Sequence, residues 1–148
     1  MIRTANAVWR GGPGAGEGSV STSSGVIRNA LYSLSSGFGN EPCTSPGEML
    51  AAAEASCMSL MFAQELAKVG IRPHAVKTVA ELKVEDINSL WTITAIHLNV
   101  EVEAPDVDPE KFREIAEAAK ERCPITRALN AHITMDARFS PAEMHALV

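Results

Sequence analysis

The chain has 148 residues, of which 46% are hydrophobic and 21% are charged, so it is long enough for one globular domain with a buried core. Its formal net charge of −5 argues against a surface that neutralises nucleic-acid phosphates or anionic lipid. No apolar run has the length needed to cross a bilayer, and residues 1–6 lack the apolar stretch of a signal peptide. We therefore expect a cytoplasmic protein without nucleic-acid or membrane partners.

Short apolar segments and glycine-rich turns dominate the N-terminal part of the chain. A segment ending at Val8–Trp9 is followed by Gly11–Gly18, which reads Gly-Gly-Pro-Gly-Ala-Gly-Glu-Gly. We interpret this run as a hairpin loop, because it lacks the GxGxxG spacing and the following helix and lysine of phosphate-binding loops. Ser19–Thr22 and Gly25–Leu31 predict two short strands, and residues 33–44 form a loop rich in glycine and serine.

A long helix is predicted in the centre of the chain. The segment Ser45–Glu48 is a capping box with proline at the first helical position, and it predicts a helix over Pro46–Val69 that ends at Gly70. Between residues 49 and 63 this helix carries one charge, Glu54, and is otherwise apolar or small on every side, which is typical of a helix buried all round. A domain of this size has difficulty covering such a helix alone, so we expect an obligate homodimer.

Alternation of apolar and polar residues predicts the strands of the C-terminal half. Val76–Val84 and Ile96–Val102 have apolar residues at every second position, which is typical of half-buried antiparallel strands. A last strand directs Ile133, Met135 and Ala137 inward. Because strands and helices do not alternate singly along the chain, this order predicts an α+β fold rather than a parallel doubly wound sheet.

Two helices are predicted between these strands. Asp108–Pro109 begins the first helix, whose apolar stripe reaches Cys123 and consists of Phe112, Ile115, Ala116 and Ala119. Pro124 interrupts that helix and begins a short one over Ile125–Leu129, with Cys123 at its N-cap, where free amides favour a thiolate. A second capping box predicts a short C-terminal helical tail from about residue 140, within a single domain that spans residues 1–148.

The cysteines are the first candidates for chemistry. Cys43, Cys57 and Cys123 are an odd number, and their spacing fits no zinc pattern, which favours free thiols or redox chemistry. Cys57 lies in the middle of the long helix, where apolar neighbours raise the pKa of a thiol and favour an inert buried side chain. The local sequence alone leaves both interpretations open.

Three stretches give these cysteines a recognisable context: Gly18–Val26, Thr44–Cys57 and Cys123–Leu129. In these stretches the sequence resembles the OsmC/Ohr family of organic hydroperoxide reductases, and the similarity covers nearly the whole chain up to Phe139. The resemblance implies an OsmC-like fold, with antiparallel sheets around a long buried central helix and two intertwined subunits. It also implies that the reactive sites lie at the dimer interface.

The resemblance further implies a role as an antioxidant peroxidase in the response to oxidative stress. Cys57 would attack the terminal oxygen of an organic hydroperoxide and become a sulfenic acid, and Cys123 would resolve it as a disulfide. An external dithiol, typically dihydrolipoamide, restores both thiols in the family, so no bound cofactor or metal is expected. The apolar surroundings of Cys57 would then form a pocket for the alkyl tail of the hydroperoxide.

Two residues of the family pattern are absent. The arginine that lowers the pKa of the reactive thiol corresponds to Gly37, and the catalytic acid corresponds to Gly47. Glu48 is the next residue, but a capping role is favoured for it. The other candidates for activating or supporting groups are Glu54, Arg10, Arg28 and Arg127.

Glu54 lies three residues before Cys57 and therefore on the same face of the helix. A solvated or interface carboxylate is an equally good interpretation of this residue. Because a carboxylate alone raises the pKa of a thiol, a catalytic Glu54 needs a cationic partner, for which we favour Arg10 or Arg28.

Other interpretations stay open. Cys43 is either incidental or a second resolving thiol, and the histidines show no ligand spacing. The main alternative function is an OsmC-fold protein that binds an apolar ligand with little or no peroxidase activity. A general disulfide-exchange protein is less favoured, because the two thiols are not arranged as CxxC.

Overall fold

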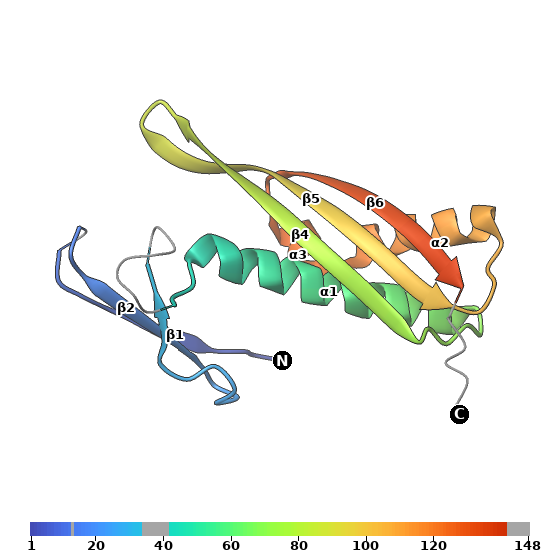
Figure 1. Ribbon diagram of the computed structural model, residues 1–148, viewed down its shortest axis with the longest axis horizontal. Helices are drawn as coiled ribbons and strands as arrows, with labels where there is room; N and C mark the ends of the chain where they lie inside the picture. The colour runs from blue at the N-terminus through green and yellow to red at the C-terminus, as the bar shows by residue number, and fades with distance from the viewer. Residues whose placement is uncertain (13, 34–41, 142–148) are drawn as a thin grey trace. The chain divides into compact units, whose positions relative to one another are not determined.

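The computed structural model describes residues 1–12, 14–33 and 42–141, which belong to two compact units, residues 1–50 and 51–148 (Figure 1). The elements in chain order are β1 (Ala5–Arg10), β2 (Glu17–Thr22), β3 (Ala30–Tyr32), α1 (Pro46–Lys68), β4 (Ala75–Ile87), β5 (Leu90–Ala104), α2 (Pro109–Arg122), α3 (Pro124–Ala128) and β6 (His132–Pro141). This mixture of sheets and helices confirms the predicted α+β class. β6 runs through Pro141, and the rest of the predicted helical tail lies outside the described residues. The assignment of residues 1–148 to a single domain stays a prediction.

The first unit contains an antiparallel sheet in the order β1-β2-β3. The glycine-rich run joins β1 to β2, which confirms the predicted hairpin. Trp9 and Tyr32 pack at a ring-centroid distance of 5.8 Å across Gly18. A Cβ atom at Gly18 would lie 2.6 Å from the Tyr32 ring, so only glycine lets the two aromatic rings approach the strand there.

The predicted strand over Gly25–Leu31 is wrong for most of its length, because β3 begins only at Ala30. Gly25 and Asn29 have φ angles of +74° and +49°, and the left-handed backbone is typical of turns. Val26 and Ile27 therefore lie in a turn, which their apolar character did not indicate.

α1 begins as predicted. The Ser45 hydroxyl accepts a hydrogen bond from the Glu48 backbone N–H at 3.1 Å, and the Glu48 carboxylate accepts one from the Thr44 hydroxyl at 3.0 Å. At the other end, Gly70 has a φ angle of +77° and donates its N–H to Ala67 at 3.1 Å. The glycine C-cap is thus confirmed, with the helix ending at Lys68, one residue before the predicted end.

The second unit contains a mixed sheet in the order β4-β5-β6. β4 and β5 form the predicted antiparallel pair, joined by a tight turn in which Asn88 and Ser89 have positive φ angles. β6 pairs with β5 in parallel, which corrects the expectation of antiparallel sheets throughout. The physical reason is that α2 and α3 form a crossover that returns the chain to the starting end of β5.

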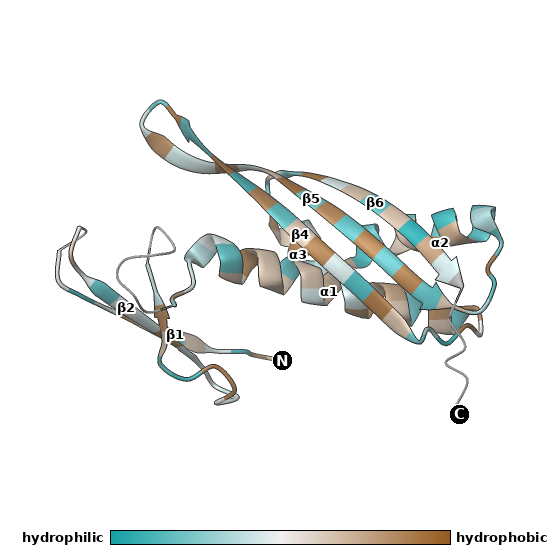
Figure 2. Ribbon diagram, in the orientation of Figure 1, coloured by the Kyte–Doolittle hydropathy of each residue, from teal (hydrophilic) through white to brown (hydrophobic). Residues whose placement is uncertain are grey.

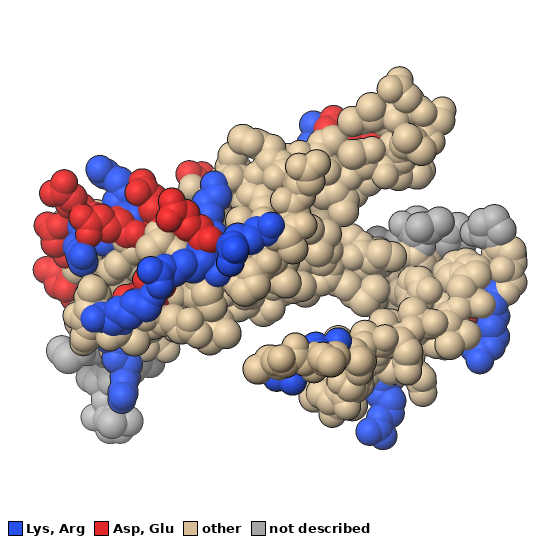
Figure 3. All heavy atoms as spheres, turned by 180° about the vertical axis from the view of Figure 1, so that it is seen from behind, with Lys and Arg blue, Asp and Glu red and all other residues tan. Residues whose placement is uncertain are grey.

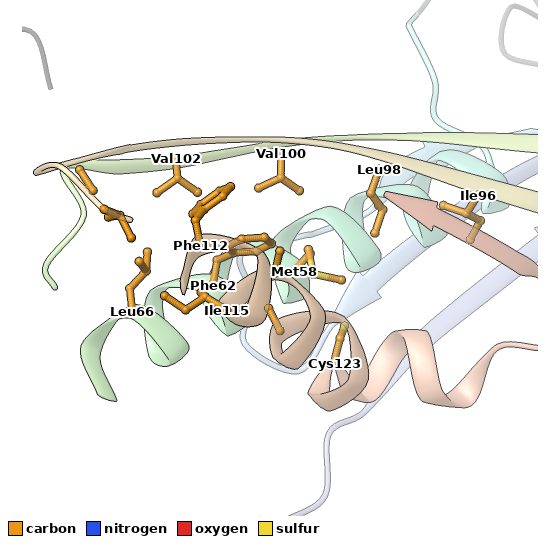
Figure 4. Packing of buried hydrophobic residues seen from close by; sticks show 14 residues of the cluster. Met58, Phe62, Leu66, Ile96, Leu98, Val100, Val102, Phe112, Ile115 and Cys123 are labelled. Atoms are coloured by element: carbon orange, nitrogen blue, oxygen red, sulfur yellow. The ribbon is translucent and has the colours of Figure 1, made fainter. Parts of the chain in front are cut away.

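The core of this unit lies where helices cover one face of the sheet. Figure 2 shows the alternation of hydropathy along β4 and β5 that directs apolar residues to this face. In Figure 4, Met58, Phe62 and Leu66 of α1 pack with apolar side chains of β5 and α2. The fully buried partners on β5 are Ile96, Leu98, Val102 and Ala104. On the face shown in Figure 3, charged side chains of both signs gather over α2.

In the single chain, α1 is not buried all round. Its buried residues form one stripe, and Leu60, on another face, has 55% of its surface exposed. The expectation of burial on every side includes a second subunit, so it stays a prediction. An apolar helix with an exposed face is what a second subunit would be needed to cover.

Candidate active site

The structure brings Cys57 and Cys123 together. Their Sγ atoms are 2.9 Å apart, although the residues are 66 positions apart in the sequence, and both thiols are free. Cys57 is partly exposed on α1, whereas Cys123 is fully buried. The pair is therefore a tertiary contact, in which one thiol faces outward and the other lies in the core.

Cys123 is held by the junction of two helices. It is the C-cap of α2 and the N-cap of α3, and its backbone N–H donates to Ala119 at 3.1 Å. Pro124 ends α2 at this point because it has no N–H to continue the helix. Figure 4 shows Cys123 at the end of the buried apolar stripe of α2, as its spacing predicts.

The first turn of α3 interacts with the Cys57 thiol, whereas the sequence indicates an interaction with the Cys123 thiol. The Cys123 side chain makes no capping hydrogen bond, although the residue occupies the predicted N-cap. Instead, the backbone N–H of Ile125 donates to the Cys57 thiol and lowers its pKa. The expected contact between these amides and the Cys123 thiol is therefore absent from the described residues, and the Cys123 side chain is buried in the core.

Glu54 is the third residue of the cluster and lies on α1, one turn before Cys57 in the sequence. It is 0% exposed, and its Oε1 accepts hydrogen bonds from the Thr126 hydroxyl and, at 3.9 Å, from the Cys123 thiol. Its Oε2 has no hydrogen-bond partner among the described residues. The interpretation of Glu54 as a solvated carboxylate is therefore wrong, and the residue lies at the two cysteines.

The net effect of these surroundings is a weakly acidic Cys57. Burial, the Cys123 thiol and the negative charge of Glu54 together raise the pKa of Cys57 to about 11, against the smaller effect of the Ile125 N–H. None of the groups that shift this pKa among the described residues is a cation. A thiolate at neutral pH thus requires a positive charge that these neighbours do not supply.

The structure describes each of the remaining candidates within its own unit. Glu48 is the capping residue at the start of α1, Arg127 is exposed on α3, and Arg10 and Arg28 are exposed residues of the first unit. Pairing of Arg10 or Arg28 with Glu54 stays a prediction. An open pocket of about 350 Å³ lies beside Thr126 and is not lined by Cys57; it consists of Glu117, Lys120, Glu121, Thr126 and Arg127. The apolar pocket for the hydroperoxide tail stays a prediction.

Two glycines stand where the family pattern has an arginine and an acid, and the structure describes only one of them. Gly47 lies in the first turn of α1, and Gly37 lies outside the described residues. Cys43 has its Sγ 3.4 Å from the Ser33 hydroxyl, within the first unit, and its role as a second resolving thiol stays a prediction. Among residues 1–12, 14–33 and 42–141, no group of three or more His, Cys, Asp or Glu side chains has a metal-binding arrangement.

Sequence reasoning missed Thr126 and the Ile125 amide. Both lie in the first turn of α3, directly after Cys123. Thr126 follows Cys123 at the same three-residue spacing that separates Glu54 from Cys57, and this spacing puts residues on one helical face. The spacing of Thr126 from Cys123 was therefore visible in the sequence. Only the contact between α1 and α3 shows that Thr126 belongs to the site.

Comparison with known proteins places this geometry in a family. A family model described as OsmC-like protein matches residues 38–138. The peroxiredoxin OsmC of Escherichia coli strain K12 is 35% identical over 128 residues, which cover 86% of this chain and 90% of that protein. The chain belongs to the OsmC-like protein family.

Solved structures agree with this assignment at the level of the fold. An OsmC-like protein of unknown function from Vibrio cholerae aligns with a TM-score of 0.76 and 16% identity, over 93% of this chain and 99% of that one. The organic hydroperoxide resistance protein OhrB of Bacillus subtilis aligns with a TM-score of 0.68 and 21% identity, over 93% and 98% of the two chains. The OsmC-like fold is thus confirmed. No helix among the described residues is long and apolar enough to cross a membrane.

The contribution of Glu54 to the Cys57 pKa gives a direct prediction for this OsmC-like protein. We expect Glu54→Gln to shift the pH profile of Cys57 alkylation to lower pH, because the neutral amide removes a negative charge that disfavours the thiolate. At pH 8, iodoacetamide should therefore modify Cys57 faster in the variant, as followed by mass spectrometry. Glu65→Gln, at a carboxylate of the same helix that pairs with Lys68, is the control. A shift to higher pH in Glu54→Gln would contradict the assignment.

Proposed function

We propose that this OsmC-like protein is a thiol-dependent peroxidase that reduces organic hydroperoxides to alcohols. The observation that carries the proposal is the contact between the partly exposed Cys57 thiol and the buried Cys123 thiol at 2.9 Å. An exposed thiol can meet a peroxide, and a second thiol within bonding reach can resolve the product before it is oxidised further. Family membership, with a relative named peroxiredoxin, supports the same chemistry.

The reaction divides into three steps. The Cys57 thiolate attacks the terminal oxygen of the hydroperoxide, the O–O bond breaks, and the alkoxide leaves as alcohol after taking up a proton. Cys123 then attacks the Cys57 sulfenic acid, which forms the Cys57–Cys123 disulfide and releases water. An external dithiol, for which we propose dihydrolipoamide, reduces the disulfide by thiol–disulfide exchange. No bound cofactor or metal enters this scheme, and its cytoplasmic location stays a prediction.

The first test is consumption of cumene or tert-butyl hydroperoxide by the purified protein with dihydrolipoamide. We expect turnover in the wild type and its loss in Cys57→Ser, because the nucleophile is gone. Cys123→Ser should still react once at Cys57 but not cycle, because no disulfide forms for the dithiol to reduce. Cys43→Ser is the matched control and should retain turnover.

Activation of Cys57 requires a cation, since burial and Glu54 both oppose its thiolate. We propose that Arg10 or Arg28 takes the place of the family arginine, whose position is occupied by Gly37. Arg10→Ala or Arg28→Ala should then slow Cys57 alkylation at pH 7, because the pKa of the thiol rises when its cation is removed. Arg3→Ala, also in the first unit, is the control. Unchanged alkylation kinetics in both variants would remove both candidates.

We also propose that the protein is a homodimer. Apolar side chains of the second unit are exposed in the single chain, on α1 at Leu60 and at the tip of the β4–β5 hairpin, where Leu90 and Trp91 are 68% and 79% exposed. Exposure of large apolar side chains at neighbouring positions is typical of interaction surfaces. We expect light scattering to give a dimer mass in dilute solution and a lower mass for Leu60→Asp. A monomer mass for the wild type would contradict the proposal.

A second candidate function is binding of an apolar ligand with little or no turnover. The observation that favours it is the raised pKa of Cys57, since a thiol that stays protonated at neutral pH is a poor nucleophile. The hydroperoxide assay separates the two functions. Absence of turnover in the wild type, with a Cys57 pKa at or above the free value of about 8.5, would favour ligand binding.

A further inference from the structure

Glu54 occupies a position where the packing of α1 calls for an apolar side chain. Met58, Phe62 and Leu66 follow it at intervals of four residues, and all of them are fully buried in the core. Glu54 continues this stripe toward the cysteines and is itself 0% exposed. Burial of a carboxylate is costly unless its oxygens are satisfied, and Oε2 has no partner among the described residues.

Glu65 is a second carboxylate with little exposure on the same helix, and its ion pairs give a comparison for Glu54. It is nearly buried, but its Oε1 lies 2.5 Å from Lys68 Nζ and 3.6 Å from Arg122 Nε, so its charge is compensated. Glu54 instead accepts hydrogen bonds from a hydroxyl and a thiol, those of Thr126 and Cys123. The Glu65 carboxylate is thus part of an ion pair, whereas the Glu54 carboxylate lies within hydrogen-bonding distance of a thiol that carries a proton.

The geometry points to Glu54 as the proton acceptor for Cys123 when the Cys57–Cys123 disulfide forms. Cys123 is fully buried, so its thiol proton has no direct route to bulk solvent. Its Sγ lies 2.9 Å from the sulfur that it must attack and 3.9 Å from the carboxylate Oε1. The Thr126 hydroxyl donates to the same oxygen and acts as a positioning residue. This inference rests on the proposed function.

The step is balanced by the residues of the cluster. The Cys123 thiol gives its proton to the Glu54 carboxylate, and the resulting thiolate attacks the sulfur of the Cys57 sulfenic acid. The S–S bond forms as the S–O bond breaks, so the Cys123 sulfur is oxidised and the sulfenic sulfur is reduced. The leaving hydroxide takes the proton from Glu54 and departs as water, which returns the carboxylate to its starting state.

Glu54 has a different role in each step. Its negative charge raises the pKa of Cys57 and so disfavours the first step, whereas its carboxylate accepts the proton of Cys123 and so favours the second. A residue that only stabilises the fold would not separate the two steps in this way. Among the described residues, the titratable groups that interact with Glu54 include Cys57 and Cys123, and its other hydrogen-bond partner, Thr126, is neutral.

The test follows one turnover of the reduced, full-length protein with one equivalent of cumene hydroperoxide at pH 7. Samples are quenched with dimedone, which traps the Cys57 sulfenic acid, and with an alkylating reagent, and intact-mass spectrometry counts each species over time. Wild type, Glu54→Gln and the control Glu65→Gln are compared. Glu54→Met is added because it continues the apolar stripe and keeps the test available if the amide is not tolerated.

In both Glu54 variants we expect the sulfenic acid to form no more slowly than in the wild type. Disulfide formation should slow by about 100-fold, the lower end of what general acid–base catalysis contributes. The dimedone adduct should therefore accumulate, and with excess peroxide the sulfinic acid should follow. The disulfide rate of Glu54→Gln should rise steeply with pH, because hydroxide replaces the lost base, while that of Glu65→Gln should match the wild type.

Three results would overturn the inference. Disulfide formation at the wild-type rate in both Glu54 variants would refute the inference. A defect of these variants confined to the oxidation of Cys57 would also refute it. Either result would leave the proposed peroxidase reaction unaffected. Absence of Cys57 oxidation in the wild type would overturn the proposed function, and the inference with it.

Discussion

The contact between Cys57 and Cys123 depends on how α1 and α2 pack against one face of the β4-β5-β6 sheet. The two sulfur atoms come from segments 66 residues apart, and no local interaction holds them at 2.9 Å. Their approach is fixed by the buried stripe of α1, which packs on β5, and by the stripe of α2, which ends at Cys123. Because the interior is close-packed, a shift of either helix would separate the thiols.

This packing also explains why the cluster contains a buried carboxylate. The stripe that brings Cys57 to Cys123 continues to Glu54, and the first turn of α3 covers it with Thr126. Position 54 is therefore buried next to a buried thiol. Burial is unfavourable for a charged carboxylate, but the short distance to the thiol suits a group that receives its proton. An apolar residue such as Met at this position would stabilise the fold more than Glu54 does. The buried carboxylate therefore lowers the free energy of unfolding.

Local signals in the sequence predicted most of the elements but only part of the cluster. Capping residues and periodicity placed the start of α1, the start of α2 and the paired strands β4 and β5 correctly, since these depend on neighbouring residues. The parallel pairing of β6 was not predicted, because it depends on where the α2–α3 crossover returns the chain. Similarly, Glu54 was recognised as a neighbour of Cys57, but its burial and its contact with Thr126 arise only when α3 packs against α1.

The electrostatics of the cluster separate two requirements of the proposed peroxidase reaction. The neighbours of Cys57 in the second unit, taken together, oppose its thiolate, whereas the first step of a peroxidase reaction needs that thiolate. The proposed disulfide chemistry needs only thiols of the second unit, whereas the proposed thiolate needs a cation that the neighbours of Cys57 do not supply. The contact between the two thiols and the activation of Cys57 are therefore separate requirements. The glycine at position 37, which replaces the family arginine, affects the second requirement and leaves the first unchanged.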